Sequence, residues 1–337
     1  MAAGKIEPAP TIDHKPHAAF FRQSGWLMIA NIIAGLMAMG VHLLAKKVSE
    51  AEYSIFGTML MITACVPMLP LQMVFAQQTA GTLATNRDRQ LAGMIRLGWL
   101  WTSILWAVAA VIILAFQSRI MARWELTSAV TLWITLGAVL MNLWSPLFSG
   151  VMQGRQDFFW LGWAMILNGV GRVVVAVLLV MAFHGGATAM ILGALVGLGA
   201  WSAIGIWRSR DLWLPPPEKF DRRALLKQAV PLFLGFGAVQ FLFTADTMFV
   251  RAYFPGDQSG FYVSAGTLSR ALLWLVLPLA TVMFPKIVHS AARSEKSNLL
   301  WLVLAGTAIL AAGVGVWVRC GGRGAAAGDR GAAVALG

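Results

Sequence analysis

Long apolar stretches dominate the sequence, and their length constrains the fold more than any other feature. A helix of about 20 apolar residues spans the hydrocarbon core of a bilayer, so each stretch predicts a transmembrane helix. Only 12% of the residues are charged, about half of the roughly 25% found in soluble domains. The sequence therefore predicts an all-α polytopic membrane protein. Nine spans are expected, over residues 25–45, 54–77, 97–116, 127–149, 160–183, 187–207, 229–250, 263–284 and 299–318.

A polar, proline-rich loop divides these spans into two groups. Residues 1–24 are too polar for a secretory signal and are interpreted as a cytoplasmic tail. Residues 25–207 form a predicted six-helix lobe, and a cytoplasmic linker at 208–228 precedes a partial second lobe at 229–318, which holds three spans. Residues 319–337 are rich in Gly, Ala and Arg, which suggests a shifted reading frame; a flexible tail is the alternative.

The basic residues between the spans predict the orientation of the chain. Cytoplasmic loops carry an excess of Lys and Arg. If the N-terminus is inside, sixteen basic residues fall in inner loops and five in outer loops. The sequence therefore predicts a cytoplasmic N-terminus. The five outer residues are Lys46, Lys47, Arg119, Arg123 and Arg251.

A weak internal repeat suggests two related lobes. "LPLQMVF" at 69–75 ends the second span, and "LPLATVMF" at 277–284 ends the eighth. Repeats of this kind are typical of transporters built from two halves. If the halves match, the second lobe is incomplete, with three spans against six. Chance similarity between apolar segments is the alternative.

The sequence contains no motif for catalysis, cofactors or metal. It has no phosphate-binding GxxxxGK[ST], no HExxH, no CxxC pair and no GxSxG, and its five histidines are scattered. The sequence predicts neither an enzyme nor a cofactor. The net charge of +12 is spread over short loops between apolar spans, which indicates membrane topology rather than binding of nucleic acid.

Two ionisable residues are expected at similar depth in neighbouring spans. Asp246 lies in the outer half of the seventh span, and Arg270 lies in the outer half of the eighth. A short hairpin joins these spans, so the two side chains could pair. Charges at membrane depth normally face a bundle interior or a wet cavity. The pair could be static, could open during transport, or Asp246 could bind a coupling ion.

Arg172 is predicted near the middle of the fifth span, with Asn168 one turn earlier on the same face. No carboxylate of the first six spans is expected at this depth; the nearest candidates, Asp157 and Glu125, lie at loop ends. An unpaired cation there suggests a water-filled cavity that attracts anions, although hydrogen bonds to helix carbonyls would also explain it. Polar faces that include Asn31 in the first span and Gln72 in the second either line this cavity or pack against other helices.

Three segments resemble the polysaccharide-transporter family of lipid-linked oligosaccharide flippases. They are "FFRQSGWLMIANIIAGLMAMG" with "KKVSEAEYSIFG", "GVMQGRQDFFWLGWAMILNGVGRVVVAVLLV", and the stretch from "AVPLFLGFGAVQFLFTADTMFVRAYFPGDQSGFY" to "MFPKI". The family belongs to the multidrug/oligosaccharidyl-lipid/polysaccharide flippase superfamily. The resemblance covers residues 18–318.

The resemblance implies two six-helix lobes around a central cavity and transport without ATP. The implied substrate is an undecaprenyl-pyrophosphate-linked oligosaccharide in the bacterial inner membrane, with a polysaccharide polymerase and assembly proteins as implied partners. It also implies that Arg172 and Arg270 contact the pyrophosphate or the sugars. The missing spans depart from the family pattern. A lipid II flippase, a multidrug-extrusion relative and a truncated, non-transporting membrane protein are the alternatives.

A charge swap tests the predicted pair. If Asp246 and Arg270 only hold each other, Asp246→Arg with Arg270→Asp should recover much of the glycan export that either single substitution removes. If Asp246 binds a coupling ion, the swap should not restore export, because the carboxylate has then left its position.

Overall fold

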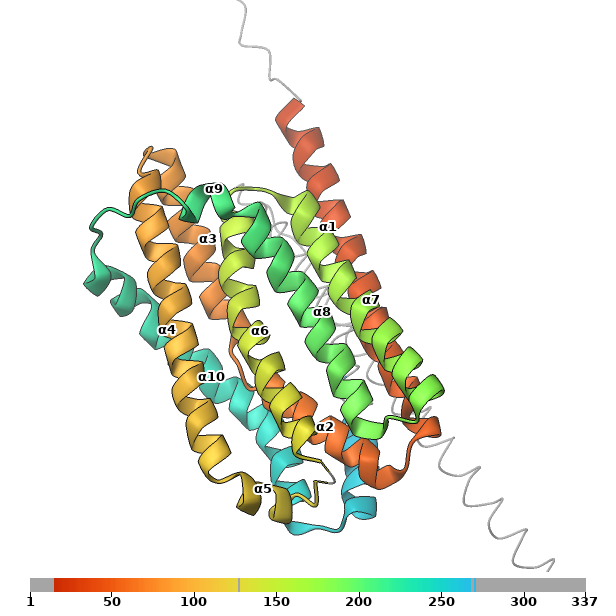
Figure 1. Ribbon diagram of the computed structural model, residues 1–337. Helices are drawn as coiled ribbons and strands as arrows, with labels where there is room; N and C mark the ends of the chain where they lie inside the picture. The colour runs from red at the N-terminus through yellow and green to blue at the C-terminus, as the bar shows by residue number, and fades with distance from the viewer. Residues whose placement is uncertain (1–14, 127, 268–269, 271–337) are drawn as a thin grey trace, which may run out of the picture. The chain divides into compact units, whose positions relative to one another are not determined.

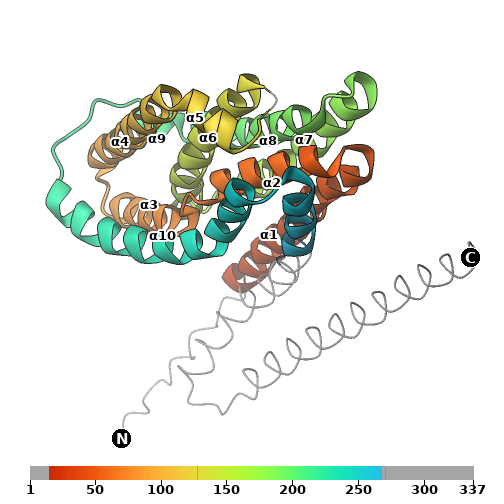
Figure 2. The ribbon, with the colours of Figure 1, turned by 90° about the horizontal axis from the view of Figure 1, so that it is seen from below.

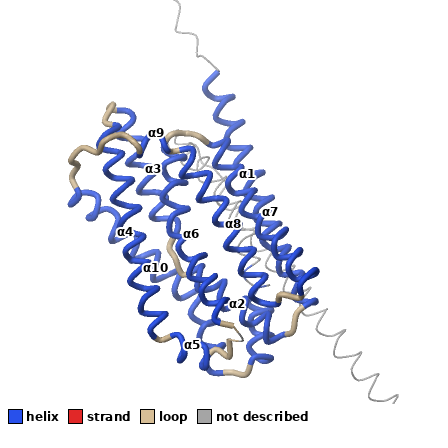
Figure 3. Tube along the Cα trace, in the orientation of Figure 1, coloured by secondary structure: helices blue, strands red, loops and turns tan. Residues whose placement is uncertain are grey.

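The computed structural model describes residues 15–126, 128–267 and 270 (Figure 1), and this part of the chain is helical without strands (Figure 3). Residue contacts group residues 1–265 in one compact unit and residues 266–337 in a second. Residues 256–267 are also helical. The labelled elements are α1 (Lys15–Gly40), η1 (Val41–Lys47), α2 (Glu50–Ala64), α3 (Met68–Ala84), α4 (Asp88–Ala115), α5 (Gln117–Arg123), α6 (Ala129–Gly154), α7 (Phe158–Phe183), α8 (Gly186–Arg208), α9 (Arg210–Trp213) and α10 (Arg222–Tyr253).

Seven of the described helical segments are long and apolar enough to cross a membrane, and they coincide with the first seven predicted spans. This confirms the all-α polytopic class. Most of the eighth predicted span (263–284), all of the ninth (299–318) and the tail at 319–337 lie outside the described residues. The division into a six-helix lobe and a partial second lobe therefore stays a prediction. The seven segments are Gly25–Lys47, Glu50–Ala84, Asp88–Ala115, Ala129–Gly154, Phe158–Phe183, Gly186–Arg208 and Leu225–Tyr253.

The second span is two helices rather than one. The chain breaks at Cys65–Pro67, between α2 and α3. Pro67 has no N–H to donate to the carbonyl of Thr63 four residues earlier. Asn142 of α6 supplies the missing donor, with its Nδ2 2.6 Å from the Thr63 oxygen. Because the bilayer core offers no water for an open carbonyl, this bond makes the break tolerable.

The first helix also differs from its prediction at both ends. It begins at Lys15, ten residues before the predicted span, so part of the segment interpreted as a tail is helical. At Gly40 it continues as the 3₁₀ helix η1, which ends at Lys47. A 3₁₀ stretch within a longer helix often marks a hinge.

Helix α8 lies between α6 and α7 (Figures 1 and 2), and it packs against α7, α6 and α2. Helix α1 packs on the other side of α7, α3 and α4 pack on α6, and α10 packs on α2 and α3. Many large apolar side chains on the outside of this bundle are exposed, for example Val111, Leu178 and Leu242. In a bilayer such surfaces face lipid or further helices.

Glycines bring the central helices close together. A Cβ at Gly150 would overlap the Gln72 carbonyl of α3, and one at Gly154 would overlap that of Ala76. Since lipid is as apolar as a leucine side chain, close van der Waals packing at small residues drives association of membrane helices. The contact between α3 and α6 therefore depends on the absence of side chains at these two positions.

The loops alternate between two ends of the bundle, here called the α9 end and the α5 end (Figure 1). At the α5 end the Glu52 carboxylate accepts a hydrogen bond of 2.7 Å from the Ala187 amide, in the first turn of α8. A carboxylate there stabilises the start of a helix through the unpaired N–H groups and the helix dipole. Gly186, with φ of +53°, faces the same carboxylate, so this contact joins α2 to α8.

Alanine substitutions test the glycine packing. Gly150→Ala should destabilise the protein by about 1–3 kcal/mol, as overpacking does, because its methyl group would meet the α3 backbone. Gly35→Ala is the control, since no described atom lies within 4 Å of its Cβ position. It should leave stability unchanged or slightly higher. Thermal unfolding in detergent measures both, and an equal response of the two variants would contradict the packing argument.

Candidate functional site

Arg172 and Asn168 lie on α7 where it approaches α8 most closely. The α8 glycines Gly193 and Gly197 face the Arg172 and Asn168 carbonyls so tightly that a Cβ at either glycine would overlap them. A Cβ at Gly197 would also lie 2.8 Å from the Asn168 Oδ1 atom. The packing of α7 on α8 therefore fixes the backbone positions of both polar residues.

Both side chains contain a buried atom that lacks a partner. Nε of Arg172 and Oδ1 of Asn168 are buried and make no hydrogen bond within the described part of the chain. Arg172 forms none of the four ion pairs found there. An unsatisfied buried polar group costs about 1–3 kcal/mol, and more if it is charged. The two unpartnered atoms therefore lower the stability of the protein, and no hydrogen bond or ion pair of the described residues offsets this cost.

Among the described residues, Arg172 interacts electrostatically with a histidine and forms no ion pair with a carboxylate. Arg172 lies close enough to His42 of η1 for the two groups to interact electrostatically. The His42 Nδ1 atom lies 2.8 Å from the Tyr53 hydroxyl of α2, and the His42 ring lies 5.6 Å from the Phe56 ring at a tilt of 55°. The surroundings of Arg172 thus include residues of η1 and α2. The ionisable side chains there, His42 and Tyr53, bring no negative charge to the guanidinium.

Asp246 has a hydroxyl partner on the helical segment that follows α10. Its Oδ2 atom accepts a hydrogen bond of 2.9 Å from the Tyr262 hydroxyl, and its Oδ1 atom accepts one of 2.7 Å from the Thr247 amide. Asp246 borders an open groove of about 630 Å³, which is otherwise lined by Trp124, Tyr262 and apolar or aromatic side chains of α10. The pairing of Asp246 with Arg270 stays a prediction, because Arg270 belongs to the second unit of the chain.

The remaining predicted cavity residues lie in other places. Gln72 of α3 donates a 3.0 Å hydrogen bond to Gln153 of α6. Asn31 is half-buried on α1. On α6, a serine packs against α8: the Ser145 hydroxyl lies 2.9 Å from that of Ser202.

Arg251 differs from its prediction as an outer-loop residue. It lies in the last turn of α10, and only 3% of its surface is exposed. Its Nη2 and Nε atoms donate hydrogen bonds of 2.6 and 3.0 Å to the Trp124 carbonyl, and Nη1 donates one of 3.3 Å to Ser259. Glu125 completes an ion pair at 3.6 Å. These contacts could not be predicted from the sequence, because Trp124 lies 127 residues from Arg251 along the chain.

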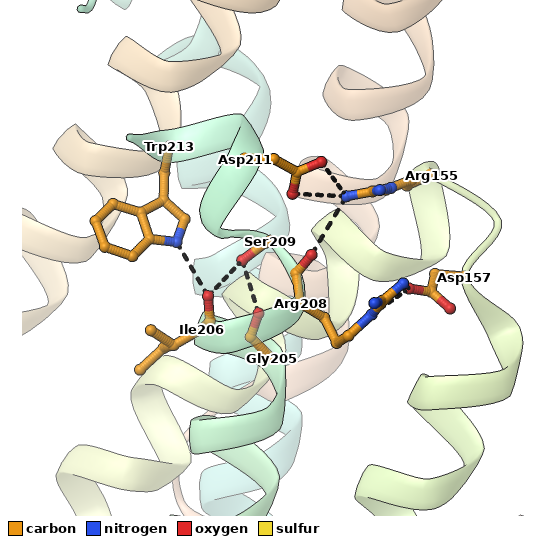
Figure 4. A network of polar contacts seen from close by, with 8 residues as sticks. All are labelled: Arg155, Asp157, Gly205, Ile206, Arg208, Ser209, Asp211 and Trp213. Carbon is orange, nitrogen blue, oxygen red and sulfur yellow. Dashed lines mark hydrogen bonds and ion pairs between the residues drawn. The ribbon is translucent and has the colours of Figure 1, made fainter. Parts of the chain in front are cut away.

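At the α9 end, the basic residues of the predicted inner loops form ion pairs (Figure 4). Arg155 donates to both carboxylate oxygens of Asp211 at 2.7 and 2.8 Å, and Arg208 pairs with Asp157 at 2.8 Å. Asp157, which was expected at a loop end, thus forms its ion pair with Arg208 at the α9 end. Glu125 is committed to Arg251 in the same way. The structure agrees with the prediction that neither carboxylate neutralises Arg172.

Among the predicted site residues, the structure brings Asn168 and Arg172 together and places Gln72, Asn31 and Asp246 on other helices. His42, Tyr53 and Tyr262 are contacts that the sequence reasoning missed. The described residues hold no cluster of three or more His, Cys, Asp or Glu side chains that could bind a metal ion. The chemistry on offer at Arg172 is attraction of an anion by a desolvated guanidinium.

The helix arrangement is similar to that of solved MATE structures. The described chain resembles an inward-facing multidrug resistance MATE family transporter of the MOP superfamily with a TM-score of 0.58 at 12% identity, covering 76% of this chain and 62% of that one. It also resembles a MATE protein in complex with Br-NRF (TM-score 0.56, 16% identity, 79% and 65% covered). An outward-facing MATE transporter matches with a TM-score of 0.54 at 15% identity, covering 79% and 62%.

Residues 20–290 match the family model described as polysaccharide biosynthesis protein. The chain belongs to this family, because the match covers more than half of its length. It spans less than two thirds of the length of the three transporter structures. A comparison with curated proteins gave no significant match.

Methionine substitutions distinguish the two buried arginines. Arg172→Met should leave stability within about 1 kcal/mol of the original or raise it, since replacing a buried charge by an apolar side chain is often neutral or stabilising. Arg251→Met should lower stability by about 2 kcal/mol or more, because the Trp124 carbonyl and Ser259 lose charged partners. Thermal unfolding in one detergent measures both. A larger loss for Arg172→Met than for Arg251→Met would contradict this assignment.

Proposed function

We propose that the protein is a flippase, which carries an undecaprenyl-pyrophosphate-linked oligosaccharide across the bacterial inner membrane by alternating access. The observation that carries the proposal is the desolvated guanidinium of Arg172, which lacks an ion pair within the described part of a polysaccharide-biosynthesis family member. A pyrophosphate linkage supplies the negative charge that this guanidinium lacks. The N-terminus then lies in the cytoplasm, with the α9 end on the same side.

The proposal assigns Arg172 to the pyrophosphate part of the substrate. Helix α1 and η1 both pack against α7, and His42 of η1 interacts with Arg172, so a movement of η1 or α1 relative to α7 would change the access to the guanidinium. Asn168 and His42 would then provide neutral hydrogen-bonding groups next to the guanidinium. Glutamines at the α3–α6 contact, such as Gln72, offer amide groups for sugar hydroxyls.

Extrusion of cationic drugs fits these residues less well. A buried, unpaired cation beside a histidine raises the energy of a second positive charge in the same region. The substrate range of the MATE proteins therefore does not transfer to this chain on fold alone. The polymerase and assembly proteins of a polysaccharide pathway remain expected partners of a flippase of this kind.

Export of glycan in cells that lack their own copy of the gene tests the proposal. Arg172→Met should lower export about tenfold to a hundredfold, the value of one lost charge-assisted contact of about 1.5–3 kcal/mol. Arg172→Lys should retain part of the activity, since its charge remains. Arg210→Met is the matched control, because Arg210 is an exposed arginine at the α9 end that lies over Trp207.

The amount of each variant in the membrane must equal that of the unmodified protein. Normal export by Arg172→Met, at equal amounts, would remove the role assigned to this residue. Normal export by Arg172→Met together with loss in Arg210→Met would place the anion contact at the α9 end instead.

A further inference from the structure

Residues 209–221, here called the strap, connect α8 to α10 and lie against α4 (Figure 1). Arg96 of α4 donates hydrogen bonds of 2.7, 2.7 and 3.2 Å to three consecutive strap carbonyls, those of Trp213, Leu214 and Pro215. One side chain of α4 thus fixes the first half of the strap, although the sequence predicts only a polar linker there.

The second half of the strap rests on the backbone of α4. The Glu218 amide donates a hydrogen bond of 3.0 Å to the Arg89 carbonyl. A Cβ at Gly93 would lie 3.0 Å from the Glu218 carbonyl and 3.2 Å from the Phe220 ring. These contacts bring the end of the strap, and with it the first turn of α10, beside the start of α4.

Basic side chains from two distant parts of the chain gather at this contact. Two belong to the start of α4, one to the end of the strap and two to the first turn of α10. All five are exposed. They define the basic patch, which consists of Arg87, Arg89, Lys219, Arg222 and Arg223.

The carboxylates of the same segments do not neutralise the basic patch. They are Asp88, Glu218 and Asp221, three against five basic side chains. Glu218 pairs with Arg89 at 3.5 Å, and the Asp221 carboxylate accepts a hydrogen bond of 2.9 Å from the Arg223 amide. The other four members of the patch take part in none of the four ion pairs found among the described residues. The patch therefore keeps a net positive charge that attracts anions.

Apolar and aromatic side chains border the basic patch. Leu226 and Val230 are exposed and lie one turn apart on α10, directly after its two arginines. Leu214 of the strap is also exposed. The rings of Trp213 and Trp99 meet edge-on at 5.5 Å where the strap crosses α4. Tryptophan is enriched where a membrane meets water, so the patch is expected at that level.

This combination fits a phospholipid better than a soluble anion. An anionic phospholipid carries a phosphate directly above apolar chains, and the chain offers cations directly before exposed apolar side chains of α10. Guanidinium groups bind phosphate oxygens through paired N–H donors. The long stems of Arg and Lys also let their charges reach the headgroup level while the stems cover apolar surface.

We propose that the basic patch binds the headgroup phosphate of an anionic phospholipid, whose acyl chain lies along Leu226 and Val230. Arg96 is then a positioning residue, which holds the strap on α4 so that the two halves of the patch stay together. The inference goes beyond the proposed function, because lipid binding at this place requires no transport.

Titration of the purified protein with phosphatidylglycerol in a neutral detergent tests the patch, with the bound lipid counted by native mass spectrometry. Arg222→Gln with Arg223→Gln should weaken the affinity about tenfold or more, because each basic residue near an anionic lipid surface contributes about fivefold. Phosphatidylcholine, which has no net charge, should bind more weakly and equally to both proteins. The matched control is Arg119→Gln with Arg123→Gln, which removes two exposed arginines at the α5 end and should change the affinity less than about twofold.

The role of Arg96 is tested with the five patch residues left in place. In Arg96→Met the rise of the thermal unfolding midpoint that phosphatidylglycerol causes should fall to less than about half. The midpoint without lipid shows whether the variant is folded. Arg96→Lys should recover part of the rise, because the ammonium group donates to fewer carbonyls than the guanidinium.

Three results would overturn the inference. An unchanged affinity of the Arg222/Arg223 variant, or an equal loss in the Arg119/Arg123 control, would remove the patch as the lipid site. Inorganic phosphate that displaces phosphatidylglycerol at equal concentration would make the ligand a free phosphate rather than a lipid. An unchanged midpoint rise in folded Arg96→Met would remove the positioning role.

Discussion

Backbone groups in a bilayer must find partners within the protein, and the rest of this structure depends on that constraint. Its clearest expression is the hydrogen bond from the Asn142 side chain to the Thr63 carbonyl at the break between α2 and α3. Pro67 creates the open carbonyl, and a buried amide on α6 satisfies it. The break changes the direction of the chain, so that α3 packs on α6 while α2 also contacts α8 and α10. A proline and an asparagine 75 positions apart thus form one structural unit.

Close packing at glycine then positions the polar groups. Gly193 and Gly197 let α8 approach the backbone of α7 at Asn168 and Arg172. Larger side chains there would separate the helices and admit lipid or other side chains beside the guanidinium. The small residues on the membrane helices thus serve a packing role, and the isolation of Arg172 is a consequence of that packing.

The sequence is sufficient to predict those parts of the structure that depend on local composition. Hydropathy over about 20 residues locates the first seven spans, because the bilayer imposes that length on any helix. The burial of Arg251 could not be predicted, since its partners are the carbonyl of Trp124 and a serine beyond the end of α10. The contact of residues 209–221 with α4 could not be predicted for a similar reason. A run of prolines indicates a stiff segment, but the contact of Glu218 and Phe220 with Gly93 depends on the tertiary fold. Asn168 and Arg172 were predicted to share a face because helical spacing alone places them one turn apart.

Arg172 and Arg251 differ in the partners that the described structure gives them. Both are desolvated, and desolvation of a guanidinium is costly wherever it occurs. At Arg251 the cost is offset by carbonyl, hydroxyl and carboxylate partners, so the contact it makes explains its presence. At Arg172 the described residues offer no such offset, and the neighbouring His42 adds no negative charge. Under the proposed function, a phosphate group of the transported lipid supplies the negative charge that the described residues do not provide.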